Sequence, residues 1–119
     1  MELEVGMYVR TKNGCICQIL RTTYSKYLSR NKELCYEVDR PINVNMELYD
    51  EDIFKASHNI IDLIEVGDYV NGEKVILKND GYIEIGTTND YIGFNNEELV
   101  KSIVTKEEFE SVSYKVERG

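Results

Sequence analysis

The sequence has few of the residues and motifs that catalytic and metal sites usually need. His58 is the only histidine, so a site with paired histidine ligands is excluded. No Gly-rich phosphate loop, Gly-x-Ser-x-Gly elbow or His-Glu-x-x-His motif occurs. Tryptophan is absent, and Pro41 is the only proline. We therefore expect a protein that is not an enzyme and that holds no cofactor.

Long apolar runs are also lacking. No stretch of about 18 apolar residues occurs, so no segment is expected to cross a membrane as a helix. The start, Met1 to Glu4, is acidic and lacks the apolar region of a secretory signal. The three cysteines show no framework spacing, which is typical of free thiols in a reducing compartment. We expect a cytoplasmic protein, or one that acts in the cytoplasm of a host cell.

The cysteines raise one metal hypothesis. Cys15, Cys17 and Cys35 together with His58 have the ligand types of a Cys₃His zinc site. The Cys-x-Cys spacing is not that of a zinc knuckle, and cysteine is a common small residue of protein cores. We interpret the cysteines as core residues and expect no metal. His58 is interpreted as a polar residue at the entrance of a strand rather than as the base of a nucleophile.

Acids are absent from the first part of the chain. Residues 5–32 hold six cations and no acid, whereas residues 33–119 hold eight cations and twenty acids. The net charge of −8 is therefore concentrated in the second part. An acidic body disfavours general nucleic-acid binding, because phosphate contacts need clustered Lys and Arg. The charge predicts either a solvated surface or an acidic face for a basic partner.

Two groups of residues are candidate binding sites. One is an acidic surface whose spacing does not match a calcium loop, formed by Glu47, Asp50, Glu51 and Asp52. The other lies in the basic arm, residues 10–32, where cations alternate with tyrosines: Arg21, Tyr24, Lys26, Tyr27, Arg30 and Lys32. Such an arm suits stacking of bases and contacts to phosphates, or contact with an acidic protein surface. A solvated loop is the alternative for each group.

An internal repeat is the most informative feature that is present. Residues 4–9, Glu-Val-Gly-Met-Tyr-Val, return at residues 65–70 as Glu-Val-Gly-Asp-Tyr-Val. Five of the six positions are identical, and β-rich sequence with a glycine turn follows each copy. The repeat predicts two copies of one supersecondary unit. We expect a first module over residues 1–57 and a second over residues 58–119.

Turn signals and alternating apolar residues predict many short strands. Hairpin turns are expected at Asn13-Gly14 and Asn79-Asp80-Gly81, and an exposed loop over residues 22–32. Strands are expected at residues 7–11, 15–20, 34–38, 53–56, 60–64, 75–77, 82–85, 91–94 and 114–116. One helix is expected near residues 105–112, because Thr105 and Glu108 fit a capping box and Val104 and Phe109 a hydrophobic staple. We predict a mainly β fold of two related small SH3-like barrel halves with one short C-terminal helix.

Two segments carry a resemblance to a known group of proteins. They are Ser-His-Asn-Ile-Ile-Asp-Leu-Ile-Glu-Val-Gly-Asp-Tyr-Val-Asn-Gly at residues 57–72 and Ile-Val-Thr-Lys-Glu-Glu-Phe-Glu at residues 103–110, followed by Tyr114-Lys115-Val116. Both resemble small uncharacterised proteins carried by phages and prophages of Gram-positive bacteria. The resemblance covers about the last 65 residues and the opening stretch, but not residues 21–51. It brings no catalytic or ligand residues and implies a phage accessory gene, many of which modulate the host or its defences.

These observations together predict a function of binding. We expect a phage-borne accessory protein that inhibits or modulates a host factor through its acidic surface, for example as an anti-defence or anti-CRISPR inhibitor. The partner would be a host protein, such as a nucleic-acid-binding or immune effector protein. One alternative is a protein that sequesters a small molecule or nucleotide in a pocket between the barrels or at an oligomer interface, lined by Tyr24, Tyr27 and the nearby cations. Another is a nucleic-acid-associated small barrel that uses the basic arm.

Overall fold

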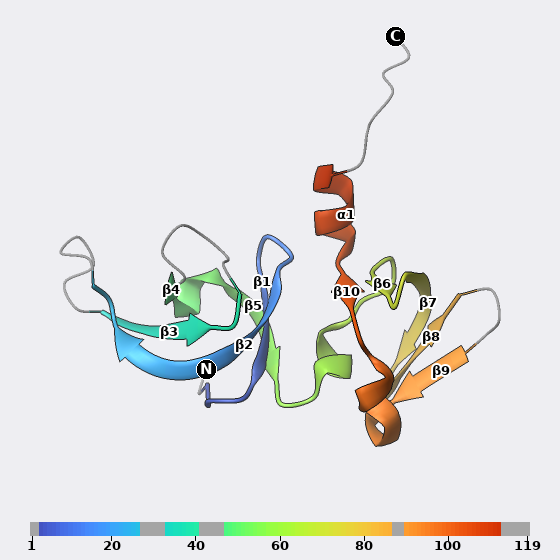
Figure 1. Ribbon diagram of the computed structural model, residues 1–119, viewed down its shortest axis with the longest axis horizontal. Coiled ribbons are helices and arrows are strands. Elements are labelled where there is room, and N and C mark those ends of the chain that lie inside the picture. Colours follow the sequence, from blue (N-terminus) through green and yellow to red (C-terminus); the bar gives the residue numbers. More distant parts are fainter. Residues whose placement is uncertain (1–2, 27–32, 41–46, 87–89, 113–119) are drawn as a thin grey trace, which may run out of the picture.

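The computed structural model describes residues 3–26, 33–40, 47–86 and 90–112, and shows a mainly β protein made of two antiparallel sheets that lie side by side (Figure 1). The two antiparallel sheets confirm the prediction of a mainly β fold. The first sheet has the strand order β4-β3-β2-β1-β5. Its strands are β1 (Tyr8–Thr11), β2 (Ile16–Tyr24), β3 (Leu34–Val38), β4 (Glu47–Leu48) and β5 (Ile53–Ser57).

The second sheet repeats this arrangement with the order β10-β6-β7-β8-β9. In both sheets four strands follow one another as a meander, and the fifth returns to pair with the first. The predicted closure into SH3-like barrels is not confirmed, because each sheet of the described residues is open. The strands are β6 (Tyr69–Val70), β7 (Glu73–Asn79), β8 (Tyr82–Ile85), β9 (Asp90–Gly93) and β10 (Ile103–Val104).

The sequence repeat is also a repeat of local structure. Gly6 and Gly67 have φ of 92° and 98°, a conformation that glycine adopts without the penalty other residues pay. The next residue of each copy, Met7 or Asp68, donates its backbone N–H to the glutamate carbonyl three residues earlier at 3.1 Å. The two copies therefore form the same turn before their first strand, as the repeat predicts.

Each sheet has its own apolar core. The first is built around Val9, Ile19 and Leu48, and Cys17 is part of it. The second is built from aliphatic side chains only: Ile61, Ile64, Val70, Val75, Ile83, Ile85 and Ile92. Cys35 is also fully buried, whereas Cys15 is half-buried. The interpretation of the cysteines as buried core residues is therefore confirmed for Cys17 and Cys35, but not for Cys15.

The helices are short, and one of them replaces an expected strand. Residues 60–64 do not form the predicted strand but a 3-10 helix, η3 (Ile60–Leu63), which begins where the Asn59 side chain accepts a hydrogen bond from the Ile61 N–H. Two further turns are η2 (Asp50–Asp52) and η4 (Phe94–Leu99). No helix within the described ranges combines the length and apolar character needed to traverse a membrane.

The predicted C-terminal helix is present as α1 (Lys106–Val112). Its capping box is confirmed, because the Glu108 N–H donates to Thr105 Oγ1 and the Thr105 N–H to Glu108 Oε1, each at 3.2 Å. Phe109 stacks on Tyr69 of β6 with ring centroids 4.6 Å apart. The strand expected at residues 114–116 lies outside the described residues.

Candidate functional site

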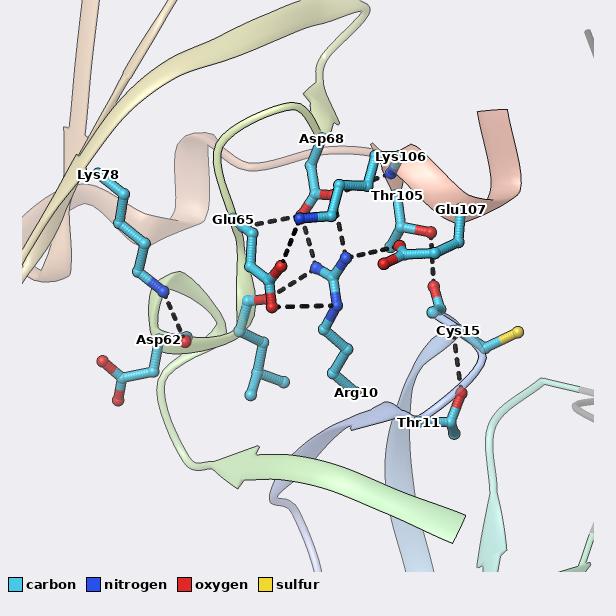
Figure 2. A network of polar contacts seen from close by, with 12 residues as sticks. Arg10, Thr11, Cys15, Asp62, Glu65, Asp68, Lys78, Thr105, Lys106 and Glu107 are labelled. Carbon is cyan, nitrogen blue, oxygen red and sulfur yellow. Dashed lines mark hydrogen bonds and ion pairs between the residues drawn. The ribbon is translucent and has the colours of Figure 1, made fainter. Parts of the chain in front are cut away.

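A buried arginine joins the two sheets. Arg10 lies on β1, is 1% exposed, and points into the second half of the molecule (Figure 2). Its Nη1 donates to Asp68 Oδ2 at 2.6 Å and its Nη2 to Asp68 Oδ1 at 3.1 Å, so the pair is bidentate. Nη1 also donates to the Leu63 carbonyl at 2.9 Å. One side chain of the first sheet thereby contacts the turn before β6 and η3.

Two further carboxylates complete what we call the Arg10 network: Arg10, Glu65, Asp68, Lys106 and Glu107 (Figure 2). Arg10 Nη2 donates to Glu107 Oε2 at 2.8 Å, and Lys106 Nζ donates to Glu65 Oε1 at 2.8 Å. Burial lowers the pKa of Arg10, but the hydrogen bond to Asp68 and the charges of Asp68, Glu65 and Glu107 together outweigh burial, and the pKa is raised. The guanidinium therefore stays charged.

Asp68 is saturated with donors. Besides Arg10, its carboxylate accepts the backbone N–H groups of Glu65 at 2.8 Å and Lys106 at 2.9 Å. The residue is 0% exposed. A carboxylate held by four donors has no free lone pair aimed at a substrate, so it does not resemble a general acid or base. The Arg10 network holds the sheets and α1 together, and we assign it a structural role.

The β1–β2 turn packs against α1 beside this network. Thr105 Oγ1 donates to the Gly14 carbonyl at 2.5 Å, and Thr105 is fully buried. A Cβ at Gly14 would lie 2.6 Å from the Glu107 Cβ. The β1–β2 turn can therefore approach α1 this closely only because residue 14 is a glycine.

The prediction that Glu47 belongs to an acidic surface is wrong. This residue is 4% exposed, and its carboxylate accepts the Ser25 hydroxyl at 3.1 Å, the Lys26 N–H at 2.9 Å and the Tyr49 hydroxyl at 2.7 Å. β4 pairs Glu47 with Glu37 and so directs it to the face of the sheet that also carries Cys35. Glu47 is therefore an internal acceptor, not a docking residue.

The other acids of that surface lie on η2. Asp50 Oδ1 accepts the Tyr36 hydroxyl at 3.0 Å, and Asp52 Oδ2 accepts the Tyr49 N–H at 3.2 Å. Asp50 and Glu51 are exposed, and Asp52 is half-buried. These acids therefore form an exposed turn whose side chains also order the tyrosines beneath it.

Replacing Glu47 by glutamine tests its internal role. Burial raises the pKa of Glu47, but the three donors outweigh it and the pKa is lowered. A lowered carboxyl pKa contributes stability that is present above the ordinary value, about 4.3, and is lost as pH falls through the folded value. At pH 7, E47Q should lower the free energy of unfolding by about 1–2 kcal/mol, and the difference should shrink below pH 4. Urea unfolding at several pH values measures this.

The control for this experiment is Glu98→Gln, because Glu98 is exposed. We expect E98Q to unfold like the unchanged protein at each pH. A difference for E47Q that stays constant from pH 7 to pH 3 would contradict the assignment, since it would not depend on the charge of the carboxylate.

The basic arm is divided by the structure. Arg21 forms a bidentate pair with Glu37 at 2.6 and 2.7 Å, and Tyr24 is 65% exposed. The two residues are three apart on β2, which extends to Tyr24 instead of giving way to the expected loop at residue 22, so their side chains point to opposite faces. Lys26 is exposed, whereas Tyr27, Arg30 and Lys32 lie outside the described residues. The described members do not converge on one surface.

A cleft of about 200 Å³ lies between the sheets, where the second hypothesis placed its pocket. It is lined by Tyr8 and Ile16 of the first sheet and by Ile103 of the second, with Arg40 at its side. Among the described residues, neither Tyr24 nor any cation of the basic arm lines this cleft. The volume is below the roughly 300–1,000 Å³ of most ligand pockets, and Arg40 is already paired with Glu108 at 3.0 Å.

His58 and the cysteines considered for nucleophilic or metal chemistry are not gathered into one site. His58 is exposed and contacts Glu4 at 2.7 Å through Nε2. Burial raises the pKa of Cys17 to about 12, so its thiol is not ionised near neutral pH. Within the described part of the chain, no group of three or more His, Cys, Asp or Glu is placed to hold a metal.

An exposed apolar row on the second sheet was not predicted from the sequence. Leu77 of β7 pairs with Glu84 of β8, which pairs with Tyr91 of β9, so these side chains form one row across the face away from the core. Tyr91 is 57% exposed and meets the Tyr82 ring edge-on at 5.7 Å. We call Leu77, Tyr82, Glu84 and Tyr91 the outer row. Its sequence signal was the alternation along residues 82–85, in which Ile83 and Ile85 face inward.

Searches with this chain against protein-family models, curated proteins and solved structures gave no match.

Proposed function

We propose that the chain is a phage-borne binding protein that modulates a host factor by docking the outer row of its second sheet on that factor. The observation that carries the proposal is the exposure of Leu77 and Tyr91 on one regular sheet face, beside the half-buried Tyr82 and Glu84. Tyrosine and other aromatic residues are enriched where protein interfaces are most buried. A cluster of such side chains in water indicates a surface that another molecule covers.

The rigidity of this face supports the proposal. Leu77, Glu84 and Tyr91 are fixed by backbone pairing on three adjacent strands, and Asn79 Nδ2 donates to the Tyr82 hydroxyl. A surface held in place by a sheet loses little conformational freedom when it binds. The outer row therefore suits a contact that needs no rearrangement of this chain.

The charge around the outer row favours a basic partner. Glu84 lies in the middle of the row, Asp80 follows β7, and Asp90 begins β9. The second part of the chain is strongly acidic as a whole. Long-range attraction to a basic groove would speed encounter, and the apolar contacts would then hold the complex. Nucleic-acid-binding effector proteins have such grooves, and the resemblance to phage and prophage proteins supports a host effector as the partner.

A capture experiment with matched variants tests this function. The tagged chain is incubated with lysate of the bacterial host, the captured protein is identified and purified, and its affinity is measured directly. Tyr91→Ser and Glu84→Lys should each weaken binding about ten-fold or more, because they remove an apolar contact and reverse a charge in the centre of the interface. Added salt should slow association in the unchanged protein.

The control variant is Phe54→Ser. Phe54 is 58% exposed and Tyr91 is 57% exposed, so the two aromatic side chains are matched in exposure. Phe54, however, lies on β5 of the first sheet. F54S should bind the partner normally. Equal binding by Y91S, E84K and the unchanged chain would refute the proposed surface, and loss of binding with F54S alone would move the interface to the first sheet.

A further inference from the structure

A groove lies between α1 and the second sheet, where α1 stands beside β6 and β10 (Figure 1). Its volume is about 370 Å³, within the roughly 300–1,000 Å³ of most small-ligand pockets. It is lined by residues of the turn before β6, of β6, of β7 and of α1: Gly67, Tyr69, Lys74, Lys106, Phe109 and Glu110. The outer row does not contribute to these lining residues, so the groove is separate from the surface of the proposed function.

Two stacked rings form the apolar part of the groove. Tyr69 of β6 and Phe109 of α1 have ring centroids 4.6 Å apart and an angle of 25° between the ring planes. Tyr69 is half-buried, whereas Phe109 is 44% exposed. Because Tyr69 covers one face of the Phe109 ring, the exposed area of Phe109 belongs to the opposite face and to the ring edge. A further planar ring that enters the groove can therefore extend the stack.

The backbone around Phe109 is fixed before any ligand arrives. The Phe109 N–H donates to the Thr105 carbonyl at 2.9 Å, and the Thr105 side chain is buried against the β1–β2 turn. The stack on Tyr69 restricts the ring itself. An aromatic side chain that is already held in place loses little conformational freedom when it binds a ligand.

Lys74 brings a positive charge to these rings. The pairing of β6 with β7 places Tyr69 opposite Lys74, so the two side chains lie next to each other on the same face of the sheet. Lys74 is exposed, and within the described part of the chain its ammonium forms no ion pair or hydrogen bond. The ammonium is therefore available to a ligand that lies against the rings.

Lys106 supplies the second cation of the groove. Its stem packs over Gly67, where an added Cβ would lie 3.5 Å from Lys106 Cδ, and its Nζ donates to Glu65 Oε1 at 2.8 Å. Glu110 is the one acid among the described lining residues. Two lysines against one glutamate make the groove positive in a part of the chain that is acidic as a whole. This local charge favours an anionic ligand.

We propose that this groove binds a small ligand that joins a planar aromatic ring to an anionic group, with the ring stacked on Phe109 and the anion at the Lys74 ammonium. Stacking on an aromatic side chain tolerates different rings, because each presents a π-face. Lysine attracts the anion as a point charge. Nucleoside monophosphates and aromatic carboxylates share this chemistry.

Titration of the whole chain with adenosine monophosphate (AMP), adenosine and inorganic phosphate tests the site. The NMR signals of the Tyr69 and Phe109 rings are followed at constant ionic strength. We expect saturable shifts with AMP, binding of adenosine about three-fold weaker because it lacks the charge, and no saturable shift with phosphate, which lacks the ring. Phe109→Leu should weaken AMP and adenosine alike, about ten-fold or more. Lys74→Met should weaken AMP about three-fold and leave adenosine unchanged.

Two variants elsewhere in the second half are the matched controls. Phe94→Leu removes a ring that is 45% exposed, and Lys101→Met removes an exposed cation outside the groove. Both should bind AMP like the unchanged chain. Thermal unfolding shows whether each variant is folded, and K74M tests the site even if F109L is not, because Lys74 is exposed.

The site is refuted by a titration with AMP that shows no saturable shifts, or by F109L and K74M binding AMP like the unchanged chain. Loss of binding with K101M alone would also refute it, because Lys101 lines the cleft between the sheets instead. A parallel titration with benzoate distinguishes the sources of the ligand. Tighter binding of AMP assigns a nucleotide, and tighter binding of benzoate assigns an aromatic carboxylate.

Discussion

Arg10→Met is expected to lower the free energy of unfolding by about 3–5 kcal/mol, because it leaves the Asp68 carboxylate buried without its cation. Methionine keeps most of the apolar stem, so the loss reports on the charge rather than on a large cavity. Asp68 is fully buried and cannot turn to solvent without breaking its bonds to the Glu65 and Lys106 amides. Chemical denaturation of the purified variant at neutral pH measures the change.

The double variant R10M/D68N separates charge from packing. Asparagine retains the shape of Asp68 and an oxygen for the backbone donors, but it carries no charge that needs Arg10. We expect the double variant to be more stable than R10M alone. Arg21→Met is the surface control, because the Arg21 pair with Glu37 is exposed and should change stability little. A double variant as unstable as the sum of the two single variants would show that the ion pair itself is not what matters.

Gly14→Ala should cost about 2–5 kcal/mol of stability. Two penalties add at this position. Gly14 has φ of 90°, where an L-residue with a Cβ pays roughly 1–2 kcal/mol, and the new methyl group would lie 2.6 Å from the Glu107 Cβ, which adds the cost of overpacking, about 1–3 kcal/mol. The measurement is again the free energy of unfolding, together with the loss of NMR contacts between the turn and α1.

Gly72→Ala serves as the comparison for this prediction. Gly72 has φ of 81°, but an added Cβ there would meet no atom within 4 Å. The variant should therefore pay the backbone penalty alone, about 1–2 kcal/mol. An equal loss of stability in G14A and G72A would mean that the turn and α1 move apart easily. The close packing of the turn on α1 would then contribute nothing to the free energy of unfolding.

The sequence predicted features that depend on neighbouring residues only. The Asn-Gly and Asp-Gly turns, the repeated Val-Gly-x-Tyr-Val unit and the capping box of α1 are local, and each appears where expected. The apolar run at residues 60–64 was wrong as a strand, because a run of this length does not distinguish a strand from a buried helical turn. The Asn59 side chain decides between them by accepting the Ile61 N–H.

The site residues were harder to predict because their environment comes from distant segments. Glu47 belongs to an acidic stretch of sequence, but cross-strand pairing and the partners Ser25 and Tyr49 make it internal. Arg10 was counted among the cations of the basic first part, yet it is the most deeply buried of the described charged side chains apart from Asp68. One signal was available: the single position that differs between the copies of the repeat is Met7 in one and Asp68, the partner of Arg10, in the other.

That difference makes the duplication asymmetric. Continuing the repeat by one residue aligns Arg10 with Asn71, which bonds to the Leu99 carbonyl and the Lys101 amide of its own half. A pair of identical half-length chains related by a twofold axis would have to form every contact between the two sheets twice. Because the two copies are linked in one chain, they need to form the contact between the sheets only once. The first copy supplies Arg10 and the second supplies Asp68. The two units are therefore not interchangeable. A chain made of two copies of either unit would lack the Arg10–Asp68 ion pair, because each unit holds only one of these two residues.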